Sequence, residues 1–184
     1  MALNVPNGDR KRLTFGPGIL LIGAAHVTPV AGGDIGYARG AVLNMTRQKL
    51  DVFQGSPRTL VETYAVQEDA TLNVTGLEWN PANLVKALGS GVATDAGALE
   101  TLEWGGEVTF TSVSLLYRHN TPTGGTVDVS FWKAQGGGEF NINFGDDLQE
   151  FQYNFRAIES TTAWDNSSLG TNKRLVKIAF TLAP

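Results

Sequence analysis

The side chains that could carry chemistry are few in this sequence and lie far apart. His26 and His119 stand near the end of a predicted strand and beside a predicted turn, with no HExxH spacing and no nucleophile motif around them. Cysteine is absent, which excludes disulfides, thiolate nucleophiles and cysteine-ligated metals. The glycines of GGDIG and QGGGEF lack the strand-to-helix context of a phosphate-binding loop. We therefore expect neither an enzyme nor a cofactor site.

Two groups of carboxylates could act together. The first could gather around a calcium ion and comprises Asp146, Asp147 and Glu150. The second could supply a glycosidase-like pair and comprises Glu100, Glu103 and Glu107. The spacing of the first group fits no EF-hand loop, and the second follows a stretch that is small and glycine-rich. We interpret both groups as solvated residues of turns and loops, and we predict no bound metal.

Length and charge restrict the class of protein further. The 184 residues fit a single domain spanning 1–184, which is large enough to bury a stable core without disulfides or a structural metal ion. The formal net charge is −4, from 14 basic and 18 acidic residues. This balance argues against a surface that grips nucleic acid, although DNA could pass nearby without being held. The absence of cysteine favours a protein assembled inside the cell.

The N-terminal region is predicted to be an arm followed by a first strand. Residues 1–16 are polar and contain Gly and Pro, so we expect a flexible arm that is ordered only when something holds it. The basic cluster Arg10–Arg12 is interpreted as part of that solvated arm. The apolar run 19–25 is interrupted by Gly23 and is too short for a transmembrane helix, and we expect no secretion signal.

Hydrophobic periodicity predicts a mainly β fold. Strands are expected near 19–27, 39–54, 59–67, 69–76, 107–118, 126–134 and 174–182. The strand at 39–54 changes phase near Arg47, as a bulge would make it, and the turn-rich tip QGSPR closes a long projecting hairpin. Residues 90–105 are expected to be a mobile loop with a brief strand near 99–102. The pattern indicates an antiparallel β-sandwich or barrel.

Helix signals are strong at one place, WNPANLVKALG, around residues 80–89. Asn80 suits the N-cap, the following proline suits the first helical position, and Gly89 suits the left-handed terminus. Trp79 and Leu84 have the spacing of a hydrophobic staple. One short helix should therefore flank the sheet.

Residues 139–158 alternate with unusual regularity and predict two half-buried strands around Gly145. Apolar residues occupy one parity and should enter the core. The other parity carries Glu150, Gln152 and Asn154, whose polar face must meet water, a ligand or another protein. Trp132 has a similar ambiguity, because it shares a face with Asp128: it lies under a helix or loop, or it anchors a partner surface.

The chain resembles the tail tube (major tail) proteins of long-tailed bacteriophages over residues 34–158. The resemblance rests on DIGYARGAVLNMTRQKLDVFQGSP, LVETYAVQEDATLNVTGLEW and NPANLVKAL, and on VDVSFWKAQGGGEFNINFGDDLQEFQYNFRAI. It is a likeness in the order of elements and not a fixed motif. It implies a virion protein that is assembled in the host cytoplasm and forms six-membered rings stacked into a tube for DNA ejection.

The resemblance also implies roles for particular residues. An inter-ring contact is expected at the hairpin tip, which comprises Gln54, Gly55, Ser56, Pro57 and Arg58. The polar face of Glu150, Gln152 and Asn154 would line the lumen or a subunit contact, and Trp132 would anchor a subunit interface. The implied partners are further copies of the chain and other tail proteins such as the tape measure, tail tip and terminator.

Two other interpretations stay open at this point. The chain could be another phage tail component, a tail tip or terminator ring, which would close a single ring without extending. It could also be a lectin-like sandwich that stacks sugars on Trp104 or Trp164.

Overall fold

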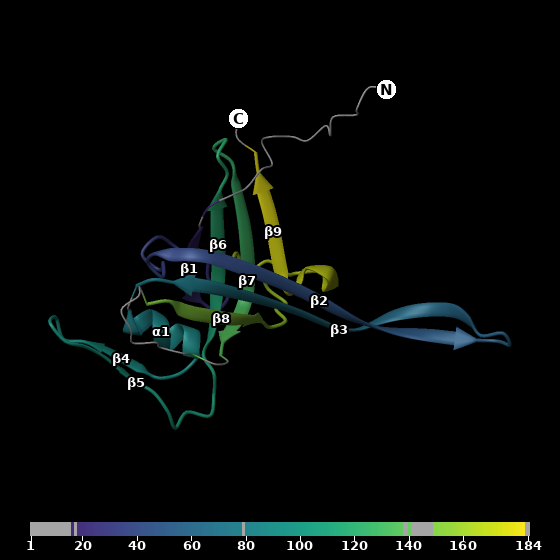
Figure 1. The fold of residues 1–184 in the computed structure, drawn as a ribbon, viewed down its shortest axis with the longest axis horizontal. Helices are drawn as coiled ribbons and strands as arrows, with labels where there is room; N and C mark the ends of the chain where they lie inside the picture. The colour runs from purple at the N-terminus through teal and green to yellow at the C-terminus, as the bar shows by residue number, and fades with distance from the viewer. Residues whose placement is uncertain (1–15, 17, 79, 138–139, 141–148, 183–184) are drawn as a thin grey trace.

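The computed structural model describes residues 16, 18–78, 80–137, 140 and 149–182, and within them the fold is mainly β with one short α-helix (Figure 1). In chain order the elements are β1 (Ile19–Ala24), β2 (Ala38–Gln54), β3 (Thr59–Gly76), α1 (Pro81–Leu88), β4 (Val92–Asp95), β5 (Glu100–Glu103), β6 (Ser112–Asn120), β7 (Thr126–Gly136), β8 (Phe151–Ala157), a 3₁₀ turn (Thr171–Lys173) and β9 (Val176–Thr181). The predicted arm and the predicted strand at 141–144 fall outside the described residues.

Strand β7 divides the main sheet into two layers. The strand order is β1-β6-β7-β8-β3-β2, with β9 also paired to β7. Residues 126–131 of β7 pair with β9, whereas residues 134–136 pair with β8. In Figure 1, β6, β7 and β9 run up the page while β8, β3 and β2 run across it. The described strands thus form an antiparallel, sandwich-like arrangement and not a closed barrel, which decides between the two predicted architectures.

Strand β8 supplies the centre of the core. Phe151, Tyr153 and Phe155 are at most 1% exposed, while the residues between them face outward, so the predicted alternation is confirmed. They pack in one core cluster with buried aliphatic residues of the neighbouring strand β3, of the other layer and of α1, which include Leu20, Ile22, Leu72, Val74, Leu84, Val113 and Leu115. Gly76 makes room for one of these rings, because a Cβ atom there would lie 2.3 Å from Cε2 of Tyr153. The core therefore requires glycine opposite tyrosine.

Helix α1 has the predicted boundaries. Asn80 accepts a 3.2 Å hydrogen bond from the backbone N–H of Asn83, and Gly89 ends the helix at φ 72°. The C-terminal turn lies close on β7, since a Cβ at Gly136 would meet the carbonyl oxygen of Ala87 at 2.1 Å. The staple involving Trp79 falls outside the described residues. No helix in the described ranges is long and apolar enough to cross a membrane.

The β2–β3 hairpin is partly sheet and partly projection. From Asp69 onward β3 alternates between half-buried and buried residues, but residues 59–68 of β3 and 44–54 of β2 are exposed throughout. The ladder shifts register between Gln48 and Lys49, near the predicted phase change, but the extra residue is Val66 of β3 and not a residue of β2. The prediction of separate strands at 59–67 and 69–76 is wrong, because β3 passes through Glu68 without a break, opposite Arg47. We call residues 44–68 the projecting hairpin.

A small second sheet was predicted only in part. Strands β4 and β5 pair in register from Val92 opposite Glu103 to Asp95 opposite Glu100, where the sequence predicted a loop with one brief strand. Both strands contact α1, which offers them a surface that local sequence does not reveal. Strand β6 begins at Ser112 and not at 107. The backbone N–H of Thr111 is bonded to Gly89 at the end of α1, so the residues just before β6 follow the helix.

Tyr153 makes the stability of the core sensitive to alkaline pH. Burial, and next the negative charge of Glu78, raise its pKa to about 12, and its hydroxyl has no hydrogen-bond partner among the described residues. An unfolded tyrosine titrates near pH ~10. The folded pKa is the higher one, so this contribution is intact below pH ~10 and falls as the pH rises from there to ~12, by about 2–3 kcal/mol.

We expect Tyr153→Phe to lose less free energy of unfolding than the wild type as the pH rises above ~10. At neutral pH its stability should be unchanged or slightly raised, since the substitution removes an unpaired buried hydroxyl. Urea unfolding at pH ~8 and pH ~11, followed by circular dichroism, measures both effects. Tyr37→Phe is the matched control, because Tyr37 is 79% exposed. An equally steep loss in the Tyr153→Phe variant would contradict the assignment.

Candidate functional site

The pair closest to a catalytic arrangement is Ser160 with His26. The Oγ of Ser160 lies 3.3 Å from Nδ1 of His26, and Oγ1 of Thr162 lies 3.2 Å from the same nitrogen. However, the Ser160 hydroxyl donates a 2.7 Å hydrogen bond to the carbonyl of Thr162, and Ser160 is only 2% exposed. Its proton is directed away from the imidazole and no substrate can reach it. This contact ties the turn after β1 to the loop after β8.

The other predicted chemical groups are scattered. His119 is 8% exposed and its Nε2 has no hydrogen-bond partner in the described part of the chain. Glu100 and Glu103 lie on β5, while Glu107 lies beyond it and accepts a 3.4 Å hydrogen bond from the backbone of Gly91. Asp146 and Asp147 fall outside the described residues. Within the described ranges no three His, Cys, Asp or Glu side chains are grouped to hold a metal ion.

Trp132 lies beneath a loop. Its indole N–H donates a 3.0 Å hydrogen bond to the carbonyl of Lys173, and its ring meets Trp164 edge-on at 5.1 Å between centroids. The residue is 7% exposed, so little of it is left to anchor a partner. The same contact occupies Trp164, one of the two tryptophans considered for sugar stacking. The structure therefore favours the loop-covered alternative for Trp132.

The predicted polar face is assembled on the outside of β8. Gln152 donates a 3.1 Å hydrogen bond to Oγ1 of Thr75, and Asn154 lies opposite Asn73 in the β3–β8 ladder. Glu150 forms an ion pair with Arg39 just before the strand. A shallow hollow of about 360 Å³ on this face is lined in part by Asn154. Whether the face meets a lumen or a neighbouring subunit stays a prediction.

The predicted contact tip occupies the far end of the projecting hairpin (Figure 1). Gly55 has φ 95°, which favours glycine in this turn, and Oγ1 of Thr59 donates a 3.1 Å hydrogen bond to the carbonyl of Gln54. The side chain of Arg58 has no ion-pair or hydrogen-bond partner among the described residues. The tip is thus a closed turn that presents a free cation. At the usual rise per residue of a strand, it lies about 35 Å from the point where β2 leaves the body.

Sequence reasoning assigned the contact to the tip alone, but exposed apolar side chains lie along the whole projecting hairpin. Its large apolar side chains are 40–59% exposed and comprise Met45, Leu50, Val52, Phe53, Leu60, Val61, Tyr64 and Val66. Leu50 lies opposite Tyr64 and Phe53 opposite Leu60, so each pair forms one apolar patch. An isolated two-stranded hairpin is marginally stable in water. The signal was present in the sequence as apolar residues on both parities of β3.

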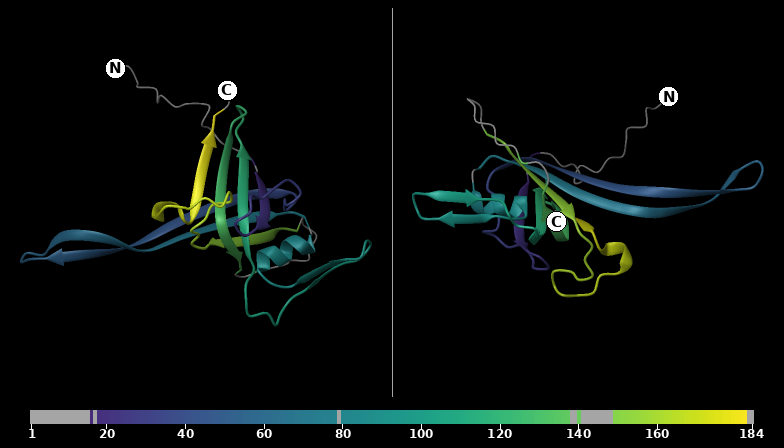
Figure 2. Two further views of the ribbon diagram at one scale, coloured as in Figure 1. Left: turned by 180° about the vertical axis from the view of Figure 1, so that it is seen from behind. Right: turned by 90° about the horizontal axis from the view of Figure 1, so that it is seen from below.

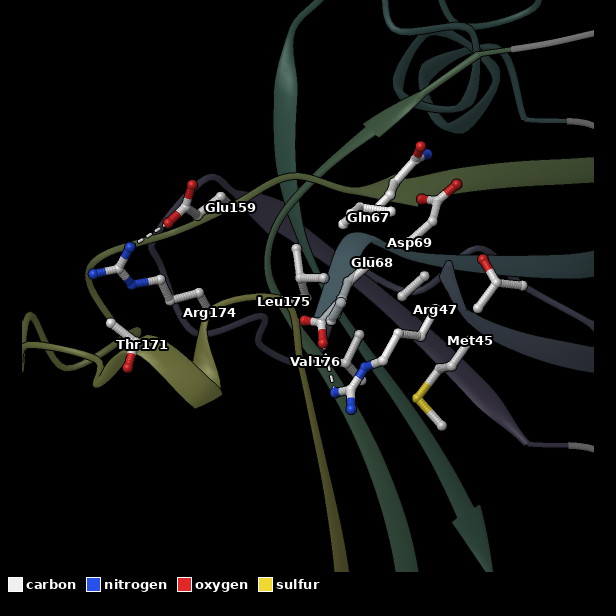
Figure 3. Close-up of a pocket in the computed structure, with 14 residues that line it drawn as sticks. Met45, Arg47, Gln67, Glu68, Asp69, Glu159, Thr171, Arg174, Leu175 and Val176 are labelled. Atoms are coloured by element: carbon white, nitrogen blue, oxygen red, sulfur yellow. Dashed lines mark hydrogen bonds and ion pairs between the residues drawn. The ribbon is translucent and has the colours of Figure 1, made fainter. Parts of the chain in front are cut away.

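A groove of about 730 Å³ marks the root of this hairpin. Figure 3 shows the ion pair of Arg47 with Glu68 on one side and that of Arg174 with Glu159 on the other. Met45 and apolar residues of the segment before β9 line the space between them. Both cations are neutralised by their partner carboxylates, and no histidine is among the residues that line the groove.

A second exposed apolar surface lies at the opposite end of the molecule and was not predicted. Residues 90–110, which we call the acidic flap, contain β4 and β5 and carry four carboxylates without any Lys or Arg. The exposed large apolar residues of the flap are Val92, Leu99, Trp104, Val108 and Phe110. The uninterrupted run of acidic charge was the available signal, but the small residues around it favoured a loop.

No protein-family model matches this chain, and no curated protein matches it either. The surfaces described above must therefore be interpreted from their own chemistry.

Trp132 and Trp104 give a matched test of these assignments. We expect Trp132→Ala to lower the free energy of unfolding by about 3–5 kcal/mol, because it leaves a cavity under the loop and an unpaired carbonyl at Lys173. Trp104→Ala should change it by less than about 0.5 kcal/mol, since Trp104 is 67% exposed. Urea denaturation of both variants measures the difference. Equal, small losses would show that Trp132 is not a core residue.

Proposed function

We propose that this protein is the tail tube subunit of a long-tailed bacteriophage, which assembles into six-membered rings stacked into a conduit for DNA. The observation that carries the proposal is the projecting hairpin. It extends well beyond the core, and it exposes apolar side chains along its whole length. The sequence resemblance to tail tube proteins over residues 34–158 supports the same function.

The energetics of the hairpin favour an assembled state. Burying a large apolar side chain contributes roughly 1.5–3 kcal/mol, and the hairpin carries such side chains on both of its strands. Contiguous exposed apolar surface of this kind marks an interaction site in soluble proteins. Within the described residues nothing covers the hairpin at positions 44–68, so a partner molecule that buries these side chains would stabilise it. Further copies of the same chain are the partner that a tube provides.

The free edges of the sheet support ring formation. Within the described strands, β2 ends one layer and pairs only with β3, and β9 pairs only with β7. Unpaired edges of this length invite pairing with another chain unless they are covered. Sheets of adjacent subunits could therefore join edge to edge around a ring.

The polar face suits a channel through which DNA slides. Proteins hold DNA by neutralising its phosphates with free Lys and Arg side chains. On this face Arg156 is paired with Asp69, and Arg39 with Glu150, so neither cation is free for phosphate. The net charge of −4 is consistent with a conduit that does not retain DNA.

The proposal carries further consequences for partners and location. Such a subunit is assembled in the host cytoplasm and resides in the tail of the virion. Its rings contact a tape measure protein inside the tube, and tail tip and terminator proteins at the two ends. A tail tip or terminator ring would use the same surfaces but would stop at one ring.

We expect the purified protein to form rings or tubes, visible by negative-stain electron microscopy, as its concentration rises. The double variant Phe53→Ser and Leu60→Ser should raise the concentration at which half of the protein is assembled at least tenfold, since it removes an apolar pair from the contact. Replacing residues 54–58 by a short Gly-Ser turn should also leave a folded monomer that cannot polymerise. Sedimentation velocity across a concentration series measures both.

The matched control is Val30→Ser, which alters an exposed valine, 68% accessible, outside the hairpin. Its assembly should equal that of the wild type. A wild-type protein that stays monomeric at every concentration would overturn the proposed function. Single rings that never lengthen would favour a tail tip or terminator component.

A further inference from the structure

Two projections leave the body of this molecule in opposite directions. In Figure 1 and in both views of Figure 2, the projecting hairpin lies at one end of the long axis and β4–β5 at the other. The two cannot touch within one copy. Each carries exposed apolar side chains that nothing in the described chain covers.

The hairpin end combines exposed apolar side chains with two cations that have no ion-pair partner among the described residues. Phe53 and Leu60 form a cross-strand pair next to the tip. Lys49 and Arg58 have no side-chain partner among the described residues, whereas Asp51 accepts a 2.7 Å hydrogen bond from Thr63. The two cations of the outer hairpin are therefore available to a partner. Its two carboxylates, Asp51 and Glu62, keep their charge but accept hydrogen bonds from Thr63 and Tyr64.

The acidic flap has the complementary character. The side chains of Glu100 and Glu103 have no hydrogen-bond or ion-pair partner in the described part of the chain. Trp104 follows them directly; its indole N–H is held by a 3.1 Å hydrogen bond to Oγ of Ser90, yet the residue is 67% exposed. A tryptophan fixed in orientation and left in water has the properties of an interface anchor. Val108, 92% exposed, adds apolar surface nearby in sequence.

Complementary ends on one molecule favour a head-to-tail contact. Contact between two different surfaces of the same chain is heterologous, so each added copy leaves one free end of each kind. Two flaps would place unpaired carboxylates together, whereas two hairpin ends would offer the cations only carboxylates that already accept a hydrogen bond. The mixed contact covers apolar surface and pairs the free cations of the hairpin end with the free carboxylates of the flap.

We propose that the acidic flap of one copy, with Trp104 as its anchor and Glu100 and Glu103 as its charges, receives the hairpin end of a neighbouring copy through Lys49 and Arg58. This inference rests on the proposed self-assembly and identifies the receiving surface within it. The occupant is a second copy of this chain. The basic segment Arg10–Arg12 is the competing occupant that the experiment must separate.

Charge reversal tests the contact. Lys49→Glu with Arg58→Glu, or Glu100→Lys with Glu103→Lys, should each raise the concentration for half-assembly about tenfold or more, because each places like charges opposite one another. The protein carrying all four substitutions should recover assembly to within about threefold of the wild type, since the pairing is restored with its signs exchanged. Circular dichroism checks that each variant is folded. Trp104→Ala should weaken assembly while leaving monomer stability unchanged.

The control is Asp165→Lys. It reverses the charge of a carboxylate that is exposed, already hydrogen-bonded and outside both surfaces. It should assemble as the wild type does. If the wild type assembles but the flap reversal has no effect, or if the fourfold variant is as weak as the twofold variants, the flap is not the receiving surface and the proposed function still stands. If the wild type does not assemble at all, the proposed function itself fails.

Cross-linking identifies the occupant directly, and the absence of cysteine makes it unambiguous. Subunits carrying only Leu99→Cys are mixed with subunits carrying only Val52→Cys and treated with a short bismaleimide. A covalent dimer is the expected result, and it does not depend on the reversed variants being folded. A dimer formed with Lys11→Cys subunits and not with Val52→Cys subunits would overturn the proposal in favour of the N-terminal segment.

Discussion

The constraint on which this structure depends is that one strand belongs to two layers. Along β7 the pairing partner changes from β9 to β8 at residues 132–133, and the three residues 129–131 just before this point are buried on both faces. Trp132 stands at the change and is held by the carbonyl of Lys173, so the loop before β9 covers one side. Four residues after Trp132 the chain reaches Gly136, whose missing side chain lets α1 approach. The division of the sheet, the covering loop and the helix are thus consequences of one eleven-residue strand.

This arrangement leaves apolar and polar surface where a self-contained domain would not. The layer of β8, β3 and β2 ends in a strand that is much longer than the core it covers, so burial stops at Asp69 while the ladder continues. Hydrogen bonds between β2 and β3 keep the projecting hairpin regular, but they do not hide its side chains. On the other side, α1 supports β4 and β5 from one direction only. Both projections are therefore held by the body, and their apolar side chains are left exposed by the described residues.

The sequence predicted those features that depend on local spacing. The alternation of β8, the caps of α1, the position of the register shift near Arg47 and the long hairpin all follow from residues that are neighbours along the chain. The β4–β5 pair could not be predicted in full, because its small residues form strands only where α1 lies against them. The choice between a sandwich and a barrel depended on β7 changing partners, which leaves no local pattern.

The candidate site shows the same division. The tip at 54–58 and the polar parity of Glu150, Gln152 and Asn154 were identifiable because turn residues and alternation are local. The environment of Trp132 was not, since its cover comes from Lys173 and Trp164, more than thirty residues away in sequence. Exposure of Trp104 depends in turn on which side of β5 meets the helix. Side chains with large apolar surface can be recognised in a sequence, but whether a partner or the chain itself covers them is decided by tertiary contacts.

The unequal chemistry of the two ends bears on how the subunit would avoid unproductive association. The flap carries four carboxylates and no cation, so contact between two flaps would bring eight negative charges together, twice four, while leaving the hairpins uncovered. Edge-to-edge pairing through β2 alone gives little selectivity for a partner strand or its orientation, because backbone hydrogen bonds are the same for any strand. The unpaired cations at the hairpin end and the carboxylates of the flap would add this selectivity, because they favour one orientation of the neighbouring copy and penalise the reverse. In the proposed assembly, the charges at the two ends would thus favour growth in one direction.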